Sequence, residues 1–250
     1  MLKVMSQNVM SWQFEEIGSF ANRRPLMKKT FLDHGADIIG MQEMIPTLEE
    51  FFKEDLAEFE YINKYRKTDN LEGVPIFWNP KTVKKLDGGW FWLSETPEVE
   101  SRGWDAKCYR ITCWILFEEI ATGKQFAFVN THLDHRGETA RQEGIKLVCK
   151  FIKDKFSADM PLILTGDFNA LPDSSTIDTA NSLLCDAREK APDTTDAPTF
   201  HGFGNAGEER IIDYIYVSDN VAVNKFERVI ERNGDSIQAD HYGIMATVEV

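Results

Sequence analysis

The sequence has little of what marks an extracellular disulfide-rich protein, a membrane protein or a nucleic-acid coat protein. It has only four cysteines in 250 residues and no metal-type C-x-x-C spacing, so we expect reduced thiols in the core. Cys108 and Cys113, an odd number of positions apart in a strand-like stretch, should face opposite sides of a sheet. The other two are Cys149 and Cys185.

Long apolar runs and targeting signals are also missing. No stretch approaches the roughly 18–20 apolar residues that span a bilayer. Residues 1–4 lack the charged and apolar segments of an export signal. We therefore expect a soluble, cytoplasmic protein; the sequence does not test whether an export leader was removed beforehand.

Positive charge is scarce as well. The chain carries 28 Lys and Arg against 41 Asp and Glu, a net charge of −13. This balance excludes a basic coat protein, a histone-like partner and a polybasic membrane anchor. Apolar residues make up 42% of the chain, enough for a packed core. Because no repeat or low-complexity linker divides it, residues 1–250 are predicted to form a single domain.

Short apolar runs rich in Val, Ile and Phe predict many strands. Turn residues bound most of these runs, and Thr122-Gly123 joins two of them as a hairpin. The predicted strands cover residues 2–9, 36–41, 74–78, 111–117, 125–133, 161–165, 211–217 and 243–250.

Helical patterns lie between some of these strands. Asn22 is predicted to cap a helix with Pro25 in its first turn that ends near His34. The segment from Thr47 has the spacing of a capping box, and residues 140–156 place apolar side chains on one stripe. Strand–helix–strand units mixed with hairpins predict an α+β fold of mixed sheets covered by helices.

Polar side chains recur at the ends of the predicted strands, where a rigid sheet presents catalytic groups. Each one alone has a structural explanation, such as a turn cap or the end of a strand. Two amides, four carboxylates and two imidazoles at such positions are harder to explain in that way. They are Asn8, Glu43, His132, Asp167, Asn169, Asp213, Asp240 and His241.

The chemistry of this set favours hydrolysis of a phosphate ester with a divalent cation. Oxygen ligands such as Glu43 and the side-chain oxygen of Asn8 suit Mg²⁺, or Mn²⁺, better than zinc. The histidines are then free to contact a phosphate, and an Asp–His pair keeps an imidazole charged and oriented. A separate carboxylate such as Asp167 can deprotonate a water for in-line attack.

Six motifs follow one another along the chain in an order typical of one enzyme family. They are Ser6-Gln7-Asn8, Gln42-Glu43, Asn130-Thr131-His132-Leu133, Gly166-Asp167-Phe168-Asn169, Ile212-Asp213-Tyr214-Ile215 and Asp240-His241. The series resembles the endonuclease/exonuclease/phosphatase family, which has the deoxyribonuclease I-like fold. The stretch from Phe91 to Gly137 looks like a bacterial subgroup of that family with poorly defined substrates.

The resemblance implies a four-layer α/β/β/α sandwich whose active site lies at one edge, where strand ends meet. By motif position, Glu43 would bind the divalent cation, Mg²⁺ or Mn²⁺, together with Asn8 and Asp240.

The resemblance also assigns the hydrolytic roles. Asp167 would activate the attacking water, and Asn169 would orient that water and the phosphate. His132 and His241 would contact the scissile phosphate as imidazolium donors, with His241 held by Asp213.

Further site residues depend on strand parity. Arg110 stands where many relatives place a phosphate-contacting Tyr or Arg, and its charge favours it over Tyr109 for this role. Asp134 shares strand parity with His132 and could touch the site, whereas His135 is predicted to point away.

Net charge bears on the substrate. A charge of −13 favours a small phosphorylated or nucleotide-like substrate over duplex DNA, because DNA binding requires several Lys and Arg on phosphates. The predicted activity is metal-dependent hydrolysis of a phosphodiester. Alternatives are a phosphomonoesterase for a sugar or inositol phosphate, and a binding module that has lost catalysis. The aromatic residues Trp90, Trp92, Trp104, Phe200 and Phe203 either line a substrate cleft or cover sheet edges.

Overall fold

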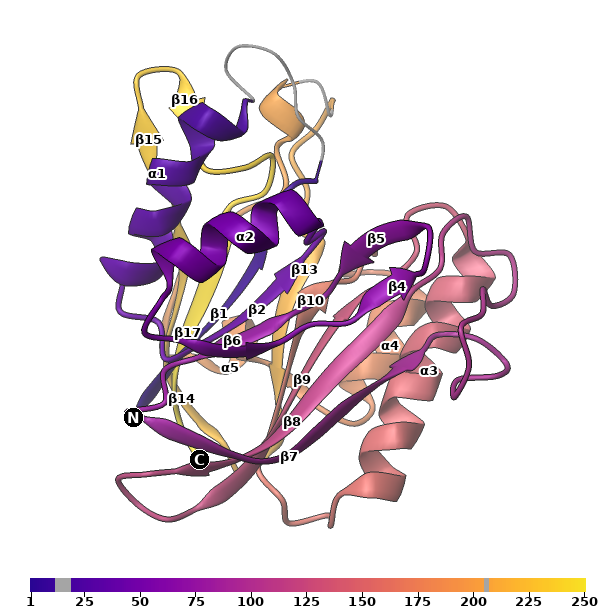
Figure 1. The fold of residues 1–250 in the computed structure, drawn as a ribbon. Coiled ribbons are helices and arrows are strands. Elements are labelled where there is room, and N and C mark those ends of the chain that lie inside the picture. Colours follow the sequence, from indigo (N-terminus) through magenta and orange to yellow (C-terminus); the bar gives the residue numbers. More distant parts are fainter. Residues whose placement is uncertain (12–18, 205–206) are drawn as a thin grey trace.

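The computed structural model describes residues 1–11, 19–204 and 207–250, and within them two large sheets pack face to face (Figure 1). The first sheet contains, in spatial order, β12 (Asp193–Thr194), β14 (Ala222–Val229), β17 (Gly243–Glu249), β1 (Leu2–Asn8), β2 (Ile38–Gln42), β6 (Ile76–Trp78) and β3 (Glu60–Ile62). The second contains β11 (Cys185–Asp186), β13 (Asp213–Val217), β10 (Leu162–Asp167), β9 (Gln125–His132), β8 (Ile111–Glu119) and β7 (Val83–Trp92). Two ribbons, β4 (Tyr65–Lys67) with β5 (Asn70–Gly73) and β15 (Arg232–Asn233) with β16 (Ser236–Ile237), stand apart from them.

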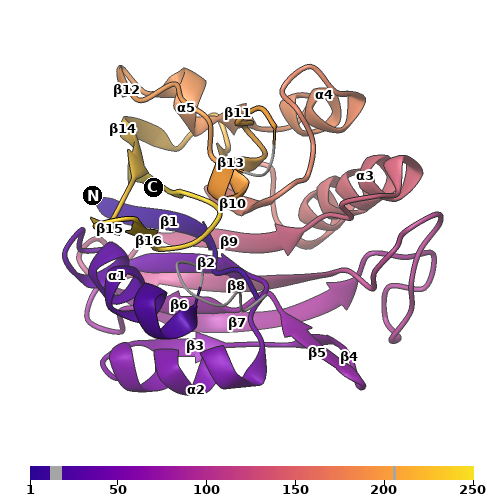
Figure 2. The same ribbon diagram turned by 90° about the horizontal axis from the view of Figure 1, so that it is seen from above.

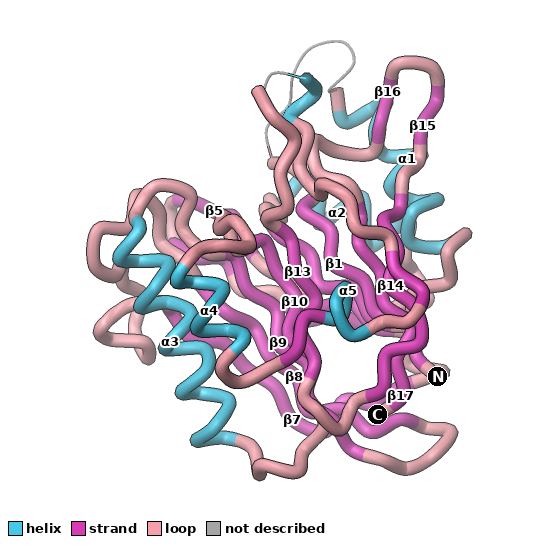
Figure 3. The backbone as a smooth tube through the Cα atoms, turned by 180° about the vertical axis from the view of Figure 1, so that it is seen from behind, coloured by secondary structure: helices cyan, strands magenta, loops and turns pink. Residues whose placement is uncertain are grey.

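Helices cover the outer faces of both sheets (Figure 2). The helices α1 (Phe20–Leu32) and α2 (Pro46–Asp55) pack on the first sheet, and α3 (Glu138–Lys155) and α4 (Ser175–Asn181) on the second. The short helix α5 (Ala187–Lys190) lies beside β14 in the view from behind (Figure 3). None of the helices in the described part has the length and apolar character needed to cross a membrane. The predicted four-layer α+β sandwich is confirmed.

Side-chain alternation along the strands fills three separate cores. On β9, Phe126 and Phe128 point between the sheets, whereas Ala127 and Val129 point toward α3. On β1, Val4 belongs to the core between the sheets, and the next residue, Met5, belongs to the core under α1 and α2. Burial on both faces explains why these strands read as continuous apolar runs.

All eight predicted strands are present, and the hairpin at Thr122-Gly123 joins β8 to β9. Among the longer strands, the prediction missed β7, an edge strand that exposes half of its residues, and β14, which lies between β12 and β17. Their sequences alternate with charged residues, so they do not form apolar runs.

The predicted helix starts were wrong. Ser19 is the N-cap of α1, so Asn22 lies inside the helix, and Pro25 is an interior residue. The helix α2 begins with Pro46 at its first position, which places Thr47 in the first turn and leaves no capping box. The apolar stripe of α3 is confirmed, because its core-facing side chains are buried.

The cysteine prediction holds only in part. All four are free, but only Cys113 and Cys149 are buried. Cys108 precedes β8 and is half-buried, so the parity argument that placed it across a sheet from Cys113 does not apply. Cys185, also half-buried, donates a hydrogen bond to Asp219 over 3.0 Å.

A buried polar seam joins the two sheets behind the site. The amide nitrogen of Asn130 donates to the main-chain oxygens of Met41 and Pro75, at 2.7 and 3.0 Å. Its oxygen accepts from Gln42 at 2.8 Å and Thr165 at 3.0 Å. Because the side chain of Asn130 bonds to Met41, Gln42 and Pro75 of the other layer, the seam fixes the offset of one sheet against the other.

Candidate active site

The polar strand ends meet because of the pairing of the strands. The pairs β1–β2 and β9–β10 are parallel, so their carboxyl ends lie at the same edge of the sandwich. Asp167, the last residue of β10, is directly opposite His132 on one neighbouring strand and Asp213 on the other. All three side chains are at least 96% buried, so Asp167 forms the centre of the site.

Asn8 connects the two sheets at this centre. Its amide nitrogen lies 3.2 Å from Oε1 of Glu43 and 3.0 Å from Oδ2 of Asp167. Its oxygen accepts the N–H of Met10 at 2.9 Å, and its predicted use as a metal ligand stays a prediction. Asn8 here links two carboxylates.

Two site residues have left-handed backbone conformations, which cost energy in residues other than glycine. Glu43 has φ 63° and Asn169 has φ 48°. Glu43 directly follows the end of β2 and Asn169 comes two residues after the end of β10, and these turns aim both side chains into the site. The Glu43 carboxylate also accepts the N–H and hydroxyl of Ser11, at 2.9 and 2.8 Å. Burial alone would raise the pKa of Glu43, but these hydrogen bonds and the charge of His241 lower it.

His241 is held as a cation. Its Nδ1 lies 2.8 Å from Oδ2 of Asp213, and its Nε2 lies 3.8 Å from Oδ2 of Asp167. Burial would lower the pKa of His241, but the charge and hydrogen bond of Asp213 raise it to about 10. The ring therefore presents a charged N–H to the pocket.

Asp167 is suited to accept a proton, whereas His241 donates one. Burial, together with the negative charge of Asp213, raises the pKa of Asp167 above its usual value. A carboxylate destabilised in this way is a better proton acceptor. The N–H of Asn169, donated to Oδ1 at 2.9 Å, orients the group.

His132 differs from the prediction, which made it an imidazolium. Burial, followed by the charge of Arg110, lowers the pKa of His132 well below its usual value, so the ring is neutral. Its Nε2 accepts the amide of Asn169 at 3.1 Å and lies 3.4 Å from Oδ2 of Asp167. Its Nδ1 then carries the proton and faces Glu72 at 4.0 Å.

Glu72 and Arg66 also line the site, although neither residue ends a predicted apolar strand. Glu72, on β5, accepts a hydrogen bond from Arg66, on β4, and lies 3.7 Å from Nη1 of Arg110. Burial, with the charge of Glu43 adding to it, raises the pKa of Glu72. A carboxylate between two guanidinium groups positions both of them.

Arg110 and Tyr109 point to different places. Arg110 is 5% exposed and lines the pocket, whereas Tyr109 packs against the core between the sheets under the ammonium of Lys67.

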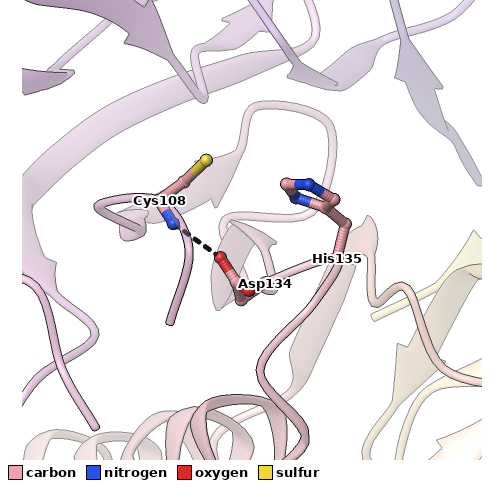
Figure 4. A group of neighbouring side chains, drawn as sticks. All are labelled: Cys108, Asp134 and His135. Atoms are coloured by element: carbon pink, nitrogen blue, oxygen red, sulfur yellow. Dashed lines mark hydrogen bonds between the residues drawn. The ribbon is translucent and has the colours of Figure 1, made fainter. Parts of the chain in front are cut away.

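The parity prediction for Asp134 and His135 was wrong. Since β9 ends at His132, alternation no longer applies two residues later. Asp134 instead binds main-chain N–H groups, one of them from Cys108 (Figure 4). His135 is the one that lines the pocket, with Nδ1 3.2 Å from Nη2 of Arg110.

The donor set at one end of the pocket fits a divalent cation. Asp240 and Glu43 both line the pocket. Burial raises the pKa of Asp240; the charge of His241 opposes this shift and Glu43 adds to it. Within the described residues, Oδ1 of Asp240 is buried without a hydrogen-bond partner. Two repelling carboxylates with an unpaired buried oxygen are the environment that a hard cation stabilises.

These groups enclose a pocket of about 470 Å³. Its described lining has acids and histidines at the base, and Phe200, alone of the five predicted aromatic residues, at one side. Phe200 packs on the ring of His241, with centroids 4.7 Å apart. Four of the chain's eleven arginines also line it: Arg66, Arg110, Arg136 and Arg210.

Comparison with known proteins identifies the family of the chain. The sequence profile of the Endonuclease/Exonuclease/phosphatase family matches residues 22–241. The chain belongs to this family. Like other endonuclease/exonuclease/phosphatase proteins, it has the deoxyribonuclease I-like fold, as its motifs predicted.

Several endonuclease/exonuclease/phosphatase relatives resemble the whole chain. A mannosyl-6-phosphatase from Bacteroides thetaiotaomicron is 31% identical, with a TM-score of 0.90 and complete coverage of both chains. A family member from Bacteroides vulgatus is 31% identical, with a TM-score of 0.92 over 100% of this chain and 98% of that one. An uncharacterised protein of Acanthamoeba polyphaga mimivirus is 30% identical over 239 residues, 86% of this chain and 87% of the relative.

Proposed function

We propose that the protein is a divalent-metal-dependent phosphoesterase that hydrolyses a small phosphate ester by in-line attack of water. The observation that carries the proposal is the placement of Asp167, whose Oδ2 lies 3.4 Å from His132, 3.8 Å from His241 and 3.0 Å from Asn8. A proton acceptor, a cationic donor and the link to Glu43 thus converge on one point.

In the proposed reaction, Asp167 accepts a proton from water as the water oxygen bonds to phosphorus. The ester P–O bond on the opposite side breaks, and its electron pair leaves with the alcohol oxygen, which takes a proton from His241 or solvent. The charged N–H of His241 stabilises the phosphoryl oxygens before that transfer. Neutral His132 and Asn169 position Asp167 and the water.

Glu43 and Asp240 would hold the cation, Mg²⁺ or Mn²⁺, and Asn8 would keep Glu43 beside Asp167. The cation supplies positive charge to the phosphate oxygens when it is bound. Ser11 orients the Glu43 carboxylate through the two hydrogen bonds described above.

Size and charge support a small substrate over duplex DNA. The pocket is about 470 Å³, and the chain as a whole carries a net charge of −13. A long polyanion would meet this field over its length, whereas a small ester meets only the arginine-lined pocket.

Two ester classes fit this site. One is a phosphodiester of nucleotide-like size, the class that the motifs predict. The second is the phosphomonoester of a sugar, supported by 31% identity over the full length of a bacterial mannosyl-6-phosphatase.

The proposal is tested with purified protein in Mg²⁺, Mn²⁺ or EDTA. Substrates are mannose 6-phosphate, an inositol phosphate, a nucleotide diester, p-nitrophenyl phosphate, and single-stranded and duplex DNA. Asp167→Asn should lower kcat by about 10²–10³ or more, and Asp173→Asn, an exposed carboxylate in the loop that follows, is the matched control. Turnover in EDTA, or an Asp167→Asn variant as active as wild type, would refute the mechanism.

A further inference from the structure

One wall of the pocket consists of hydrogen-bond donors beyond those that the proposed hydrolysis uses. Arg110 lies next to His132 through their shared neighbour Glu72, at 3.7 and 4.0 Å. His135 contacts Arg110 in turn, and Arg136 lines the pocket beside it. We call Arg110, His135 and Arg136 the donor wall.

The turn that carries this wall is rigidly held. The Oδ1 of Asp134 accepts the N–H groups of Lys107, Arg136 and Gly137 at 3.1, 2.9 and 2.8 Å. Its Oδ2 accepts the N–H of Cys108 at 2.9 Å. Both carboxylate oxygens of Asp134 are occupied by these hydrogen bonds. Asp134 therefore orients the donor wall and places no free carboxylate in the pocket.

Cys108, Asp134 and His135 approach one another closely enough to suggest a metal site, with ligand atoms within 4.8 Å (Figure 4). Two contacts argue against it. Both oxygens of Asp134 already bind main-chain N–H groups, and the guanidinium of Arg110 occupies the Nδ1 side of His135. A cation here would face a fixed positive charge, so the cluster is better suited to an anion.

The contact with Arg110 also fixes the tautomer of His135. A guanidinium only donates hydrogen bonds, so Nδ1 of His135, 3.2 Å from Nη2, must be unprotonated. Its Nε2 then carries the proton and is a donor for a ligand. Arg136 is exposed and makes no ion pair with a carboxylate in the described part of the chain.

A phosphomonoester differs from a diester in having a third terminal oxygen and a second negative charge. In the proposed reaction His241, Asn169 and a cation held by Glu43 would face two non-bridging oxygens, which both ester classes have. We propose that the donor wall binds the third terminal oxygen and so makes the enzyme selective for phosphomonoesters. This inference rests on the proposed function, because it assigns the ester class of the same site.

The test uses two substrates with the same leaving group, p-nitrophenyl phosphate and methyl p-nitrophenyl phosphate. They differ only in whether the third oxygen is free or methylated. The ratio of their kcat/KM values, measured with Mg²⁺ or Mn²⁺, therefore reports recognition of that oxygen. Wild type should prefer the monoester.

His135→Ala and Arg136→Gln should each lower this ratio about tenfold, as expected for one charge-assisted hydrogen bond. His135 and Arg136 are both exposed, and circular dichroism checks that each variant folds, so Arg136→Gln still tests the proposal if His135→Ala folds poorly. Arg102→Gln removes the same charge from an exposed site outside the pocket lining and should leave the ratio unchanged.

An unchanged ratio in Arg136→Gln, or equal loss of both activities, would overturn the assignment of the wall. A wild-type preference for the methylated substrate would do the same. Failure of wild type to hydrolyse either substrate with metal present would instead count against the proposed function.

Discussion

Nδ1 of His241 lies 2.8 Å from Oδ2 of Asp213, and both side chains are more than 95% buried. The pair connects the two sheets, since Asp213 begins β13 of the second sheet and His241 lies just before β17 of the first. A buried imidazolium without a counter-ion would lose its proton. The two residues therefore act as one unit.

Asp213→Asn should lower kcat by about 10²–10³, because His241 loses the charge that keeps it protonated. His241→Gln should have a similar effect, and the double variant should be little worse than either single one. Asp235→Asn, an exposed carboxylate in the β15–β16 turn, is the control. Steady-state kinetics on any substrate that wild type hydrolyses measures these losses in kcat. If the losses of the two single variants add up in the double variant, the residues act separately.

Glu43→Gln should weaken the binding of Mn²⁺ about tenfold or more, since an amide lacks the charge of the carboxylate. Calorimetric titration of metal-free protein with Mn²⁺ measures this without reference to catalysis. Glu50→Gln, on the exposed face of α2, makes the same change in charge as Glu43→Gln and should bind Mn²⁺ as wild type does. Equal affinities in the two variants would remove Glu43 from the metal site.

Asp134→Asn should destabilise the fold at neutral pH and much less in acid. Burial would raise the pKa of Asp134, but four main-chain N–H groups lower it to about 2. A lowered pKa adds stability above the unfolded value, about 4, and this stability is lost as pH falls toward 2. Urea unfolding of wild type and variant from pH 7 to pH 3 measures the difference, which should shrink with acid. A difference independent of pH would show that the charge plays no part.

Gly166→Ala should destabilise the protein and displace Asp167, which follows it. A Cβ at this position would lie 2.3 Å from the main-chain oxygen of Thr131, and a strand backbone cannot yield cheaply. We expect a loss of about 2–4 kcal/mol in the free energy of unfolding. Gly144→Ala, on α3, meets its nearest side chains at 3.5 Å and should be neutral or stabilising. Thermal unfolding compares the two.

The sequence revealed the residues that end buried strands, and their pairing explains why. Asp167 and His132 close apolar runs on neighbouring parallel strands, so proximity follows from the pattern itself. Glu72 lies on a four-residue ribbon strand with no apolar run, and only the tertiary fold carries it to His132. His135 was misplaced because alternation was extended past the end of its strand.

The first residues of the helices and the edge strands were also predicted wrongly or missed. The capping pattern at Thr47 predicts one start for the helix, but α2 begins at Pro46, whose fixed φ suits the first position of a helix. The strand β7 carries the exposed charged residues Lys84, Lys85 and Asp87, so its hydrophobic signal is weak. Such elements are stabilised by neighbours that a single sequence does not identify.

The seam around Asn130 has a consequence for how this enzyme can fail. Glu43 and Asn8 are carried by one sheet and Asp167 by the other, so the distance between the proposed metal ligand and the proposed base depends on how the two sheets pack. Asn130 holds the two sheets in register through its hydrogen bonds to Gln42 and Met41. A change there could leave a well-folded molecule whose two half-sites no longer meet, inactive although every catalytic side chain is in place.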